Sequence, residues 1–172
     1  MKMKSNIMKS FAVRLLLLAG LVMLVTSCDK KMFYSESIDV DESGWSMNDG
    51  ATFDIEVSPD DTSQVYLCYV DIRNRSDYRY SNIYFFIKTV TPDNNMSVDT
   101  VEFVMMGQGD DGQWHWGGKE SGGYVDGRYP LSRQPFKFPQ PGTYHFEIRQ
   151  AMRDTLLQGI KNIGMYVEKV EM

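Results

Sequence analysis

Cysteine and histidine are scarce in this sequence. Its 172 residues include two cysteines, Cys28 and Cys68, and two histidines, His115 and His145. Cys68 lies in an apolar run, so we expect a buried and unreactive thiol. If Cys28 is modified, as argued below, Cys68 has no partner for a disulfide and the fold must be stabilised by its core. Neither histidine lies in a ligand spacing such as H-x-x-x-H, so we expect no metal site and no cofactor.

Sequence motifs of common hydrolases are also missing. No serine or cysteine lies in a strained nucleophile turn such as G-x-S-x-G. Asp110 and Asp111 lack the D-x-D-x-D-G series of a calcium loop, and a turn explains them more simply. A hydrolase with two paired carboxylates stays open as an alternative, because 23 acidic residues offer many pairs and a sequence gives no distances. We predict that the protein is not an enzyme.

The first 27 residues have the order of a secretory signal. They carry four basic residues and no acidic one, and the apolar run Leu15–Val25 follows the basic part. This run is shorter than the roughly 17 to 25 residues that a comfortable membrane span needs. The next residues, Val25-Thr26-Ser27-Cys28, resemble the lipobox of bacterial lipoproteins, in which the cysteine is acylated and becomes the new first residue. We therefore predict a cleaved lipoprotein signal at residues 1–27 and a membrane anchor at Cys28.

Cleavage after residue 27 leaves 145 residues, enough for one domain with a substantial core. Their net charge is −9, because four basic residues are removed with the signal. Such an acidic surface repels polyphosphate, so nucleic acid is not an expected partner. Residues 28–50 are mostly polar and are predicted to form the acylated N-terminus and a tether, with an opening strand near residues 34–40. Residues 51–172 are predicted to form the folded domain.

Apolar residues mostly alternate with polar ones beyond residue 50, which is typical of half-buried strands. In residues 51–57, for example, Phe53, Ile55 and Val57 alternate with Asp54 and Glu56. Similar runs, separated by turn residues, cover 65–73, 81–90, 98–106, 142–149 and 163–172. The pattern predicts an all-β protein, an antiparallel β-sandwich of jelly-roll type with about seven strands. Helical spacing of apolar residues adds one short helix near residues 151–157, ended by Gly159.

The glycine-rich stretch from Gly107 to Pro130 is the most unusual part of the sequence. It gathers the aromatic residues Trp114, His115, Trp116 and Tyr124 among eight glycines. On a mobile loop these aromatic faces would suit a glycan or a peptide as ligand. The alternative, which we favour, is that the tryptophans fold back and close one end of the sandwich, while the glycines only permit the path of the chain.

A set of short motifs resembles the GldH family of gliding-motility lipoproteins of the Bacteroidetes. One group lies in the run from Ile72 to Ile87, and others lie at Asp99-Thr100, at Gly142 and Tyr144, and after Gly159. The residues that carry the resemblance most clearly are Arg73, Asn74, Asp77, Tyr78, Tyr80, Ser81, Asn82, Gln150, Met152 and Arg153. The glycine-rich stretch departs from the family, in which a W-L-G-x-G run is usual where this chain has Trp114-His115-Trp116-Gly117-Gly118.

The resemblance implies a lipid-anchored protein of the bacterial cell envelope, either periplasmic or in the outer membrane, and we expect the periplasmic face of the outer membrane. It implies a non-enzymatic interaction component of gliding-motility-type machinery, with envelope proteins as partners and with the membrane bound through acylated Cys28. From the residues alone, a glycan- or peptide-binding lipoprotein module that uses Trp114, His115, Trp116 and Tyr124 is the alternative.

Overall fold

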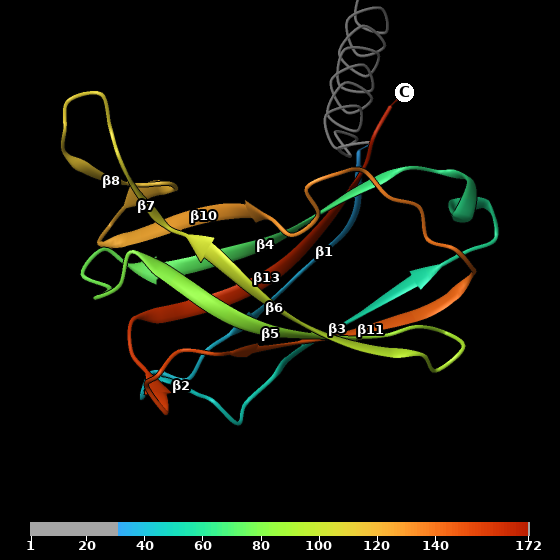
Figure 1. Ribbon diagram of the computed structural model, residues 1–172, viewed down its shortest axis with the longest axis horizontal. Coiled ribbons are helices and arrows are strands. Elements are labelled where there is room, and N and C mark those ends of the chain that lie inside the picture. The colour runs from blue at the N-terminus through green and yellow to red at the C-terminus, as the bar shows by residue number, and fades with distance from the viewer. Residues whose placement is uncertain (1–30, 172) are drawn as a thin grey trace, which may run out of the picture. The chain divides into compact units, whose positions relative to one another are not determined.

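The computed structural model describes residues 31–171 (Figure 1). The predicted signal at residues 1–27 and the predicted acylation site Cys28 lie outside the described residues. Within the described part of the chain, no helix has both the length and the hydropathy that crossing a bilayer requires.

Two antiparallel sheets face each other and form a β-sandwich (Figure 1). The first has five strands in the order β1-β13-β4-β10-β9, with the bounds β1 Met32–Asp39, β13 Ile160–Lys169, β4 Tyr66–Arg75, β10 Tyr124–Pro130 and β9 Lys119–Ser121. The second has four strands in the order β3-β11-β5-β6, with the bounds β3 Ala51–Val57, β11 Gly142–Gln150, β5 Asn82–Val90 and β6 Met96–Val104. The predicted all-β antiparallel sandwich is confirmed.

One pair of short strands distant in the sequence, one short hairpin and one 3-10 turn complete the described structure. Strand β2 (Trp45–Ser46) pairs with β12 (Leu156–Leu157), and β7 (Met106–Gln108) pairs with β8 (Trp114–Trp116). The 3-10 turn η2 (Asp60–Ser63) connects β3 to β4.

The core lies between the sheets and follows the alternation of the sequence. In β3 the residues Ala51, Phe53, Ile55 and Val57 are buried, and the three residues between them are exposed. Tyr66, Phe53 and Phe85 are the largest of the fully buried side chains. Cys68 is also buried, as predicted, and burial raises the pKa of its thiol to about 12.

Residues 32–39 of the segment predicted to be a tether form a strand of the five-stranded sheet, which confirms the opening strand predicted near residues 34–40. Strand β1 pairs with β13 from Met32 to Asp39, and β2 follows at Trp45. The folded unit therefore begins at Lys31 and not at residue 51. The sequence is polar here because β1 is an edge strand with exposed residues on both faces, which leaves the period-two signal weak.

The short helix predicted near residues 151–157 is wrong. This segment bends and then forms β12, in which Leu157 is fully buried. The buried side chain of Gln150 replaces the helical hydrogen bonds: its Nε2 donates to the carbonyl of Asp154 at 2.8 Å, and its Oε1 accepts from the amide of Met152 at 2.8 Å. Side-chain bonds of this kind offer the backbone an alternative to the helix.

The glycine-rich stretch forms β7, β8, β9 and β10 and is not a single loop. Strand β10 was missed because Gly127 interrupts its apolar pattern. A Cβ at Gly127 would lie 2.5 Å from the hydroxyl oxygen of Tyr129, so glycine is required for the Tyr129 ring to pack there. Val125 and Tyr129 face the core, whereas Asp126 and Arg128 are exposed.

The two ends of the sandwich hold different parts of the chain. At the N-terminal end the chain enters β1 near η2, and Lys169 Nζ lies 3.0 Å from Asp61 Oδ1. At the other end lie the β4–β5 connection, the bend after Gln150 and the β7–β8 pair (Figure 1). Strand β13 runs from one end to the other, which at about 3.3 Å per residue separates them by roughly 30 Å.

Candidate binding surface at the motif end of the sandwich

The family-motif residues predicted from the sequence meet at the end opposite to Met32, which we call the motif end. They come from the end of β4, the β4–β5 connection, the start of β5 and the bend after β11. These residues are Arg73, Asn74, Asp77, Tyr78, Tyr80, Ser81, Asn82, Gln150, Met152 and Arg153. Segments more than 60 residues apart in the sequence thus meet at this end, as the contact between Tyr80 and Asp154 shows, although Asn74, Tyr78 and Gln150 are buried there.

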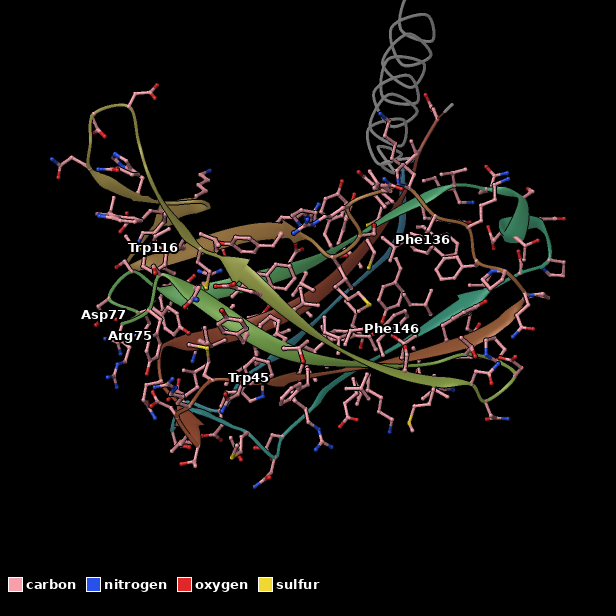
Figure 2. The ribbon with its side chains drawn as sticks, in the orientation of Figure 1. Trp45, Arg75, Asp77, Trp116, Phe136 and Phe146 are labelled. Carbon is pink, nitrogen blue, oxygen red and sulfur yellow. The ribbon has the colours of Figure 1, made fainter. Side chains whose placement is uncertain are left out.

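The β4–β5 connection is held in shape by an ion pair and by backbone bonds (Figure 2). Arg75 donates through Nε and Nη2 to the two carboxylate oxygens of Asp77 at 2.8 and 2.6 Å, which lowers the pKa of Asp77. The amide of Arg75 donates to the carbonyl of Gly159, and the amide of Ser76 donates to that of Gly123. The connection is therefore tied to its neighbours on both sides.

Tyr78 connects this turn to the core. Its side chain is buried, and burial raises its pKa. The ring lies 5.7 Å from that of Tyr80 and 6.5 Å from that of Trp116. Gly159 packs against the Tyr78 ring. Its φ is +88°, and a Cβ at this position would lie 3.0 Å from Tyr78 Cδ2. A larger residue at Gly159 would therefore be strained and would press on the ring.

Asp154 links the β4–β5 connection to the bend after β11. It accepts a hydrogen bond from the Tyr80 hydroxyl at 2.9 Å, which raises the pKa of Tyr80, and its Oδ2 lies 3.6 Å from Arg79 Nη1. The Arg79 guanidinium lies 4.9 Å from the centre of the Tyr80 ring. Asp154 was not singled out from the sequence, because its partners lie on a segment distant in the chain.

Asn74 is a motif residue whose burial the sequence did not indicate. It follows the buried residues of β4 on the same face and is fully buried. Its Nδ2 donates to the carbonyl of Arg75 at 2.8 Å, whereas its Oδ1 accepts no hydrogen bond from the described residues. A buried polar group of this kind is costly, so Asn74 contributes to the local conformation more than to the strength of the core.

The four aromatic residues proposed as ligand contacts do not form one platform. Trp114 is exposed on β8. Trp116, labelled in Figure 2, is partly buried and packs against the core at Tyr78. His115 Nε2 lies 2.9 Å from Asp111 Oδ2, a contact within the same hairpin. Tyr124 lies on β10, under the guanidinium of Arg73 at 5.0 Å. The structure thus places Trp116 as packing and leaves Trp114 as an exposed aromatic residue at this end.

A pocket that sequence reasoning missed lies on the outer face of the five-stranded sheet. Its volume is about 830 Å³, and charged residues of β1, β4, β10 and β13 line it. Arg128 donates to both carboxylate oxygens of Asp71 at 2.7 and 2.8 Å and lies 3.5 Å from the centre of the Tyr166 ring. The alternation of charged residues along β4 and β10 was the feature of the sequence that could have indicated this pocket.

The described residues contain no group of three or more His, Cys, Asp or Glu placed to hold a metal ion.

Comparison with known proteins gives a match to one family over most of the described chain. The family model described as GldH lipoprotein matches residues 32–167. The chain belongs to the GldH lipoprotein family. A gliding motility lipoprotein GldH homolog of Christiangramia forsetii is 31% identical over 155 residues, which cover 86% of this chain and 90% of that protein. The gliding motility lipoprotein GldH of Flavobacterium johnsoniae is 31% identical over 166 residues, which cover 90% and 94%.

The match to the GldH family includes β1 and extends almost to the end of β13. The resemblance found in the sequence is thereby confirmed. Among solved structures, dimeric latent PorU of Porphyromonas gingivalis aligns with 82% of this chain and 13% of PorU, with a TM-score of 0.35 and 8% sequence identity. A similarity this low supports no argument about function.

Proposed function

We propose that this member of the GldH family is a non-enzymatic lipoprotein, anchored by acylated Cys28 at the periplasmic face of the outer membrane, and that its motif end binds envelope proteins of a gliding-motility-type machinery. The observation that carries the proposal is the position of the motif residues, at the end of the sandwich opposite to Met32. Cys28 precedes Lys31 by three residues, so their Cα atoms are at most about 11 Å apart. An acyl anchor would therefore hold the N-terminal end near the bilayer and leave the motif end available.

The polar groups of the motif end support a binding role over a catalytic one. Arg75 and Asp77 bond to each other, and Asp154 bonds to Tyr80. Groups engaged in this way define the shape of a surface. They are poorly placed to transfer protons to a substrate, since a general acid or base must reach the reacting group directly.

Site-specific crosslinking in living cells tests the binding role. A photoreactive residue at Arg79, in the exposed β4–β5 connection, is expected to crosslink to envelope proteins. The same residue at Ser63, an exposed position in η2 at the N-terminal end, is the matched control and is expected to give no protein crosslink. Equal crosslinking from both positions, or none from Arg79 at good expression, contradicts a binding surface at the motif end.

Metabolic labelling tests the anchor. Radiolabelled palmitate is expected to enter the full chain and to be absent from the Cys28→Ala variant, whereas Cys68→Ala, which removes the buried thiol, is expected to label normally. Protease added to intact cells is expected to leave the protein whole and to cleave it once the outer membrane is permeabilised. Label in Cys28→Ala contradicts the anchor, and cleavage in intact cells contradicts the periplasmic face.

One observation favours glycan or peptide binding as a second function. Trp114 is 63% exposed at the motif end, where a large aromatic face is available for stacking. Tryptophan fluorescence is expected to change on titration with cell-wall fragments, and Trp114→Ala is expected to abolish the change. Trp45→Phe, which alters a buried tryptophan, is the control. An unchanged spectrum across glycan and peptide fragments contradicts this second function.

A further inference from the structure

The edges of the two sheets are protected to different degrees. In the five-stranded sheet, edge strand β1 has an irregular register between Met32 and Tyr34, and edge strand β9 has only three residues, one of them Lys119. In the four-stranded sheet, β3 contacts β1 of the other sheet. Bulges, short length, lysine and covering strands are the usual means of keeping an edge from pairing with another chain.

Strand β6 has none of these protections. It pairs in continuous register with β5 over nine residues from Met96 to Val104, and among the described strands it pairs with β5 alone. It contains no lysine, proline or glycine. The other edge of β6 therefore presents a long row of backbone groups without a partner strand, which can accept a further strand.

An apolar strip lies beside this edge on the outer face of the sheet. Even-numbered residues of β5 and β6 face outward, since Ile83, Phe85 and Ile87 are buried on the other face. Five of the exposed large hydrophobic side chains of the described chain belong to this face: Tyr84, Phe86, Met96, Val98 and Val104. Val98 and Val104 are 59% and 65% exposed. Apolar strips of this kind mark surfaces for a protein partner more often than free surface.

The charges of β6 indicate which kind of strand fits. The strand carries Asp99 and Glu102 and no basic residue. Glu102 accepts a hydrogen bond from Asn82 Nδ2 at 2.6 Å, whereas Asp99 is exposed. If two copies of β6 paired about Thr100, their Asp99 side chains would face each other diagonally at about 7–8 Å, and like charges so placed repel. A second copy therefore fits less well than a strand with a basic residue.

We propose that β6 binds an extended segment of a partner protein, which adds a strand to the four-stranded sheet, packs apolar residues beside Val98 and Val104, and places a lysine or arginine at Asp99. The backbone edge would supply affinity, and the apolar strip and Asp99 would supply specificity. This surface follows the free edge of β6 and borders the motif end where Asn82 contacts Glu102, and the proposal depends on the proposed function only in taking the partner to be a protein.

Amide hydrogen exchange on the full acylated chain tests this proposal. The probe is a short synthetic peptide in which valine alternates with lysine, and the matched peptide has glutamate in place of lysine. The lysine peptide is expected to slow exchange of β6 amides at least tenfold, and the glutamate peptide is expected to have little effect. Asp99→Lys is expected to reverse this preference. Val98→Lys is expected to weaken binding of the lysine peptide at least tenfold.

Controls separate binding at β6 from other causes. Thr52→Lys adds the same charge to an exposed position of β3 in the same sheet, so peptide binding should stay unchanged. No slowing with either peptide, or equal slowing with both, overturns the proposal. Slowing of β6 exchange with rising protein concentration and no peptide would show that a second copy occupies the edge, and also overturns it. Crosslinking from Arg79 is independent of these results, so failure of this proposal is distinguishable from failure of the proposed function.

Discussion

The outer face of the five-stranded sheet and the β5–β6 half of the four-stranded sheet differ in the side chains that they expose. On the five-stranded sheet, charged side chains bond across strands, as Arg128 does with Asp71 and Arg73 does with Asp126. On the four-stranded sheet, the β5–β6 half exposes Phe86, Val98 and other large apolar side chains. On the first face charged side chains bond to one another, whereas the second exposes apolar side chains and an unpaired strand edge to water. The difference indicates that the two faces meet different surroundings.

The largest expected effect comes from filling the centre of the polar face. Gly164 lies between Ser37 of β1 and Asp71 of β4, and a Cβ there would lie 3.1–3.3 Å from Glu36 O, Asp71 Cβ and Ser37 Cβ. Gly164→Val is therefore expected to lower the free energy of unfolding by about 1–3 kcal/mol through overpacking. Thr100→Val, on the apolar face, is expected to change it by less than about 0.5 kcal/mol. Urea unfolding measures both, and equal effects would contradict the contrast between the faces.

A smaller effect is expected from removing a charge on the polar face. Asp71→Asn keeps the shape of the side chain but loses the two charged bonds to Arg128, so it is expected to cost about 0.5–1 kcal/mol at low salt, because both groups are partly exposed. The loss should shrink at high salt. Asp126→Asn is the control, since its contact with Arg73 is longer, at 3.6 Å, and it should cost less. Urea unfolding at two salt concentrations measures whether Asp71→Asn costs more stability than Asp126→Asn.

Two tyrosines sharpen the comparison through their pKa values. On the polar face, burial and then a 2.9 Å hydrogen bond to Glu168 raise the pKa of Tyr69, whereas on the apolar face a hydrogen bond to Glu102 is the main cause of the raised pKa of Tyr84. Glu102→Gln is therefore expected to lower the pKa of Tyr84 more completely than Glu168→Gln lowers that of Tyr69. NMR titration of the tyrosine ring carbons measures both. Equal changes would contradict the assigned causes.

The raised pKa values of Tyr69 and Tyr84 determine the direction in which stability changes at alkaline pH. Both folded-state pKa values lie above the ordinary tyrosine pKa of about 10. Each tyrosine therefore contributes stability that is fully present below about pH 10 and is lost as the pH rises through the folded-state pKa. Urea midpoints between pH 9 and pH 12 are expected to fall, and a midpoint that rises over this range would contradict the direction of the shifts.

The smallest expected effect is on the stability of the apolar face itself. Val98 is 59% exposed, so Val98→Lys is expected to change the free energy of unfolding by less than about 0.5 kcal/mol. Ile87→Lys, at a position that faces the core from the neighbouring strand, is a positive control outside this ranking and is expected to prevent folding. Thermal unfolding distinguishes the two. A large loss for Val98→Lys would mean that this strip is needed for folding and is not a free surface.

Much of the fold followed from local patterns. The alternation in residues 51–57 predicted β3 residue by residue, and the runs around Val70, Phe85, Ile148 and Val167 predicted β4, β5, β11 and β13. The errors have identifiable causes. The predicted helix fails because the buried Gln150 side chain bonds to the backbone of the bend, and β10 was missed because Gly127 makes room for Tyr129.

The candidate site was only partly visible in the sequence. The motif residues were singled out by resemblance to the family, but their meeting at one end depends on contacts such as Tyr80 with Asp154, which lie 74 positions apart. The aromatic residues of the glycine-rich stretch looked equivalent in the sequence. The structure separates Trp116, which packs against the core, from Trp114, which is exposed.

The sequence by itself determined that this chain forms antiparallel strands and which residues of each strand share a face, because side chains alternate along any extended backbone. Only the tertiary structure decided which faces are covered and which edges are bare. In β6 both faces carry apolar residues, yet Phe103 is buried and Val104 is exposed. Strand order arises from pairing between distant segments, and a local sequence pattern does not indicate which strands will pair with it.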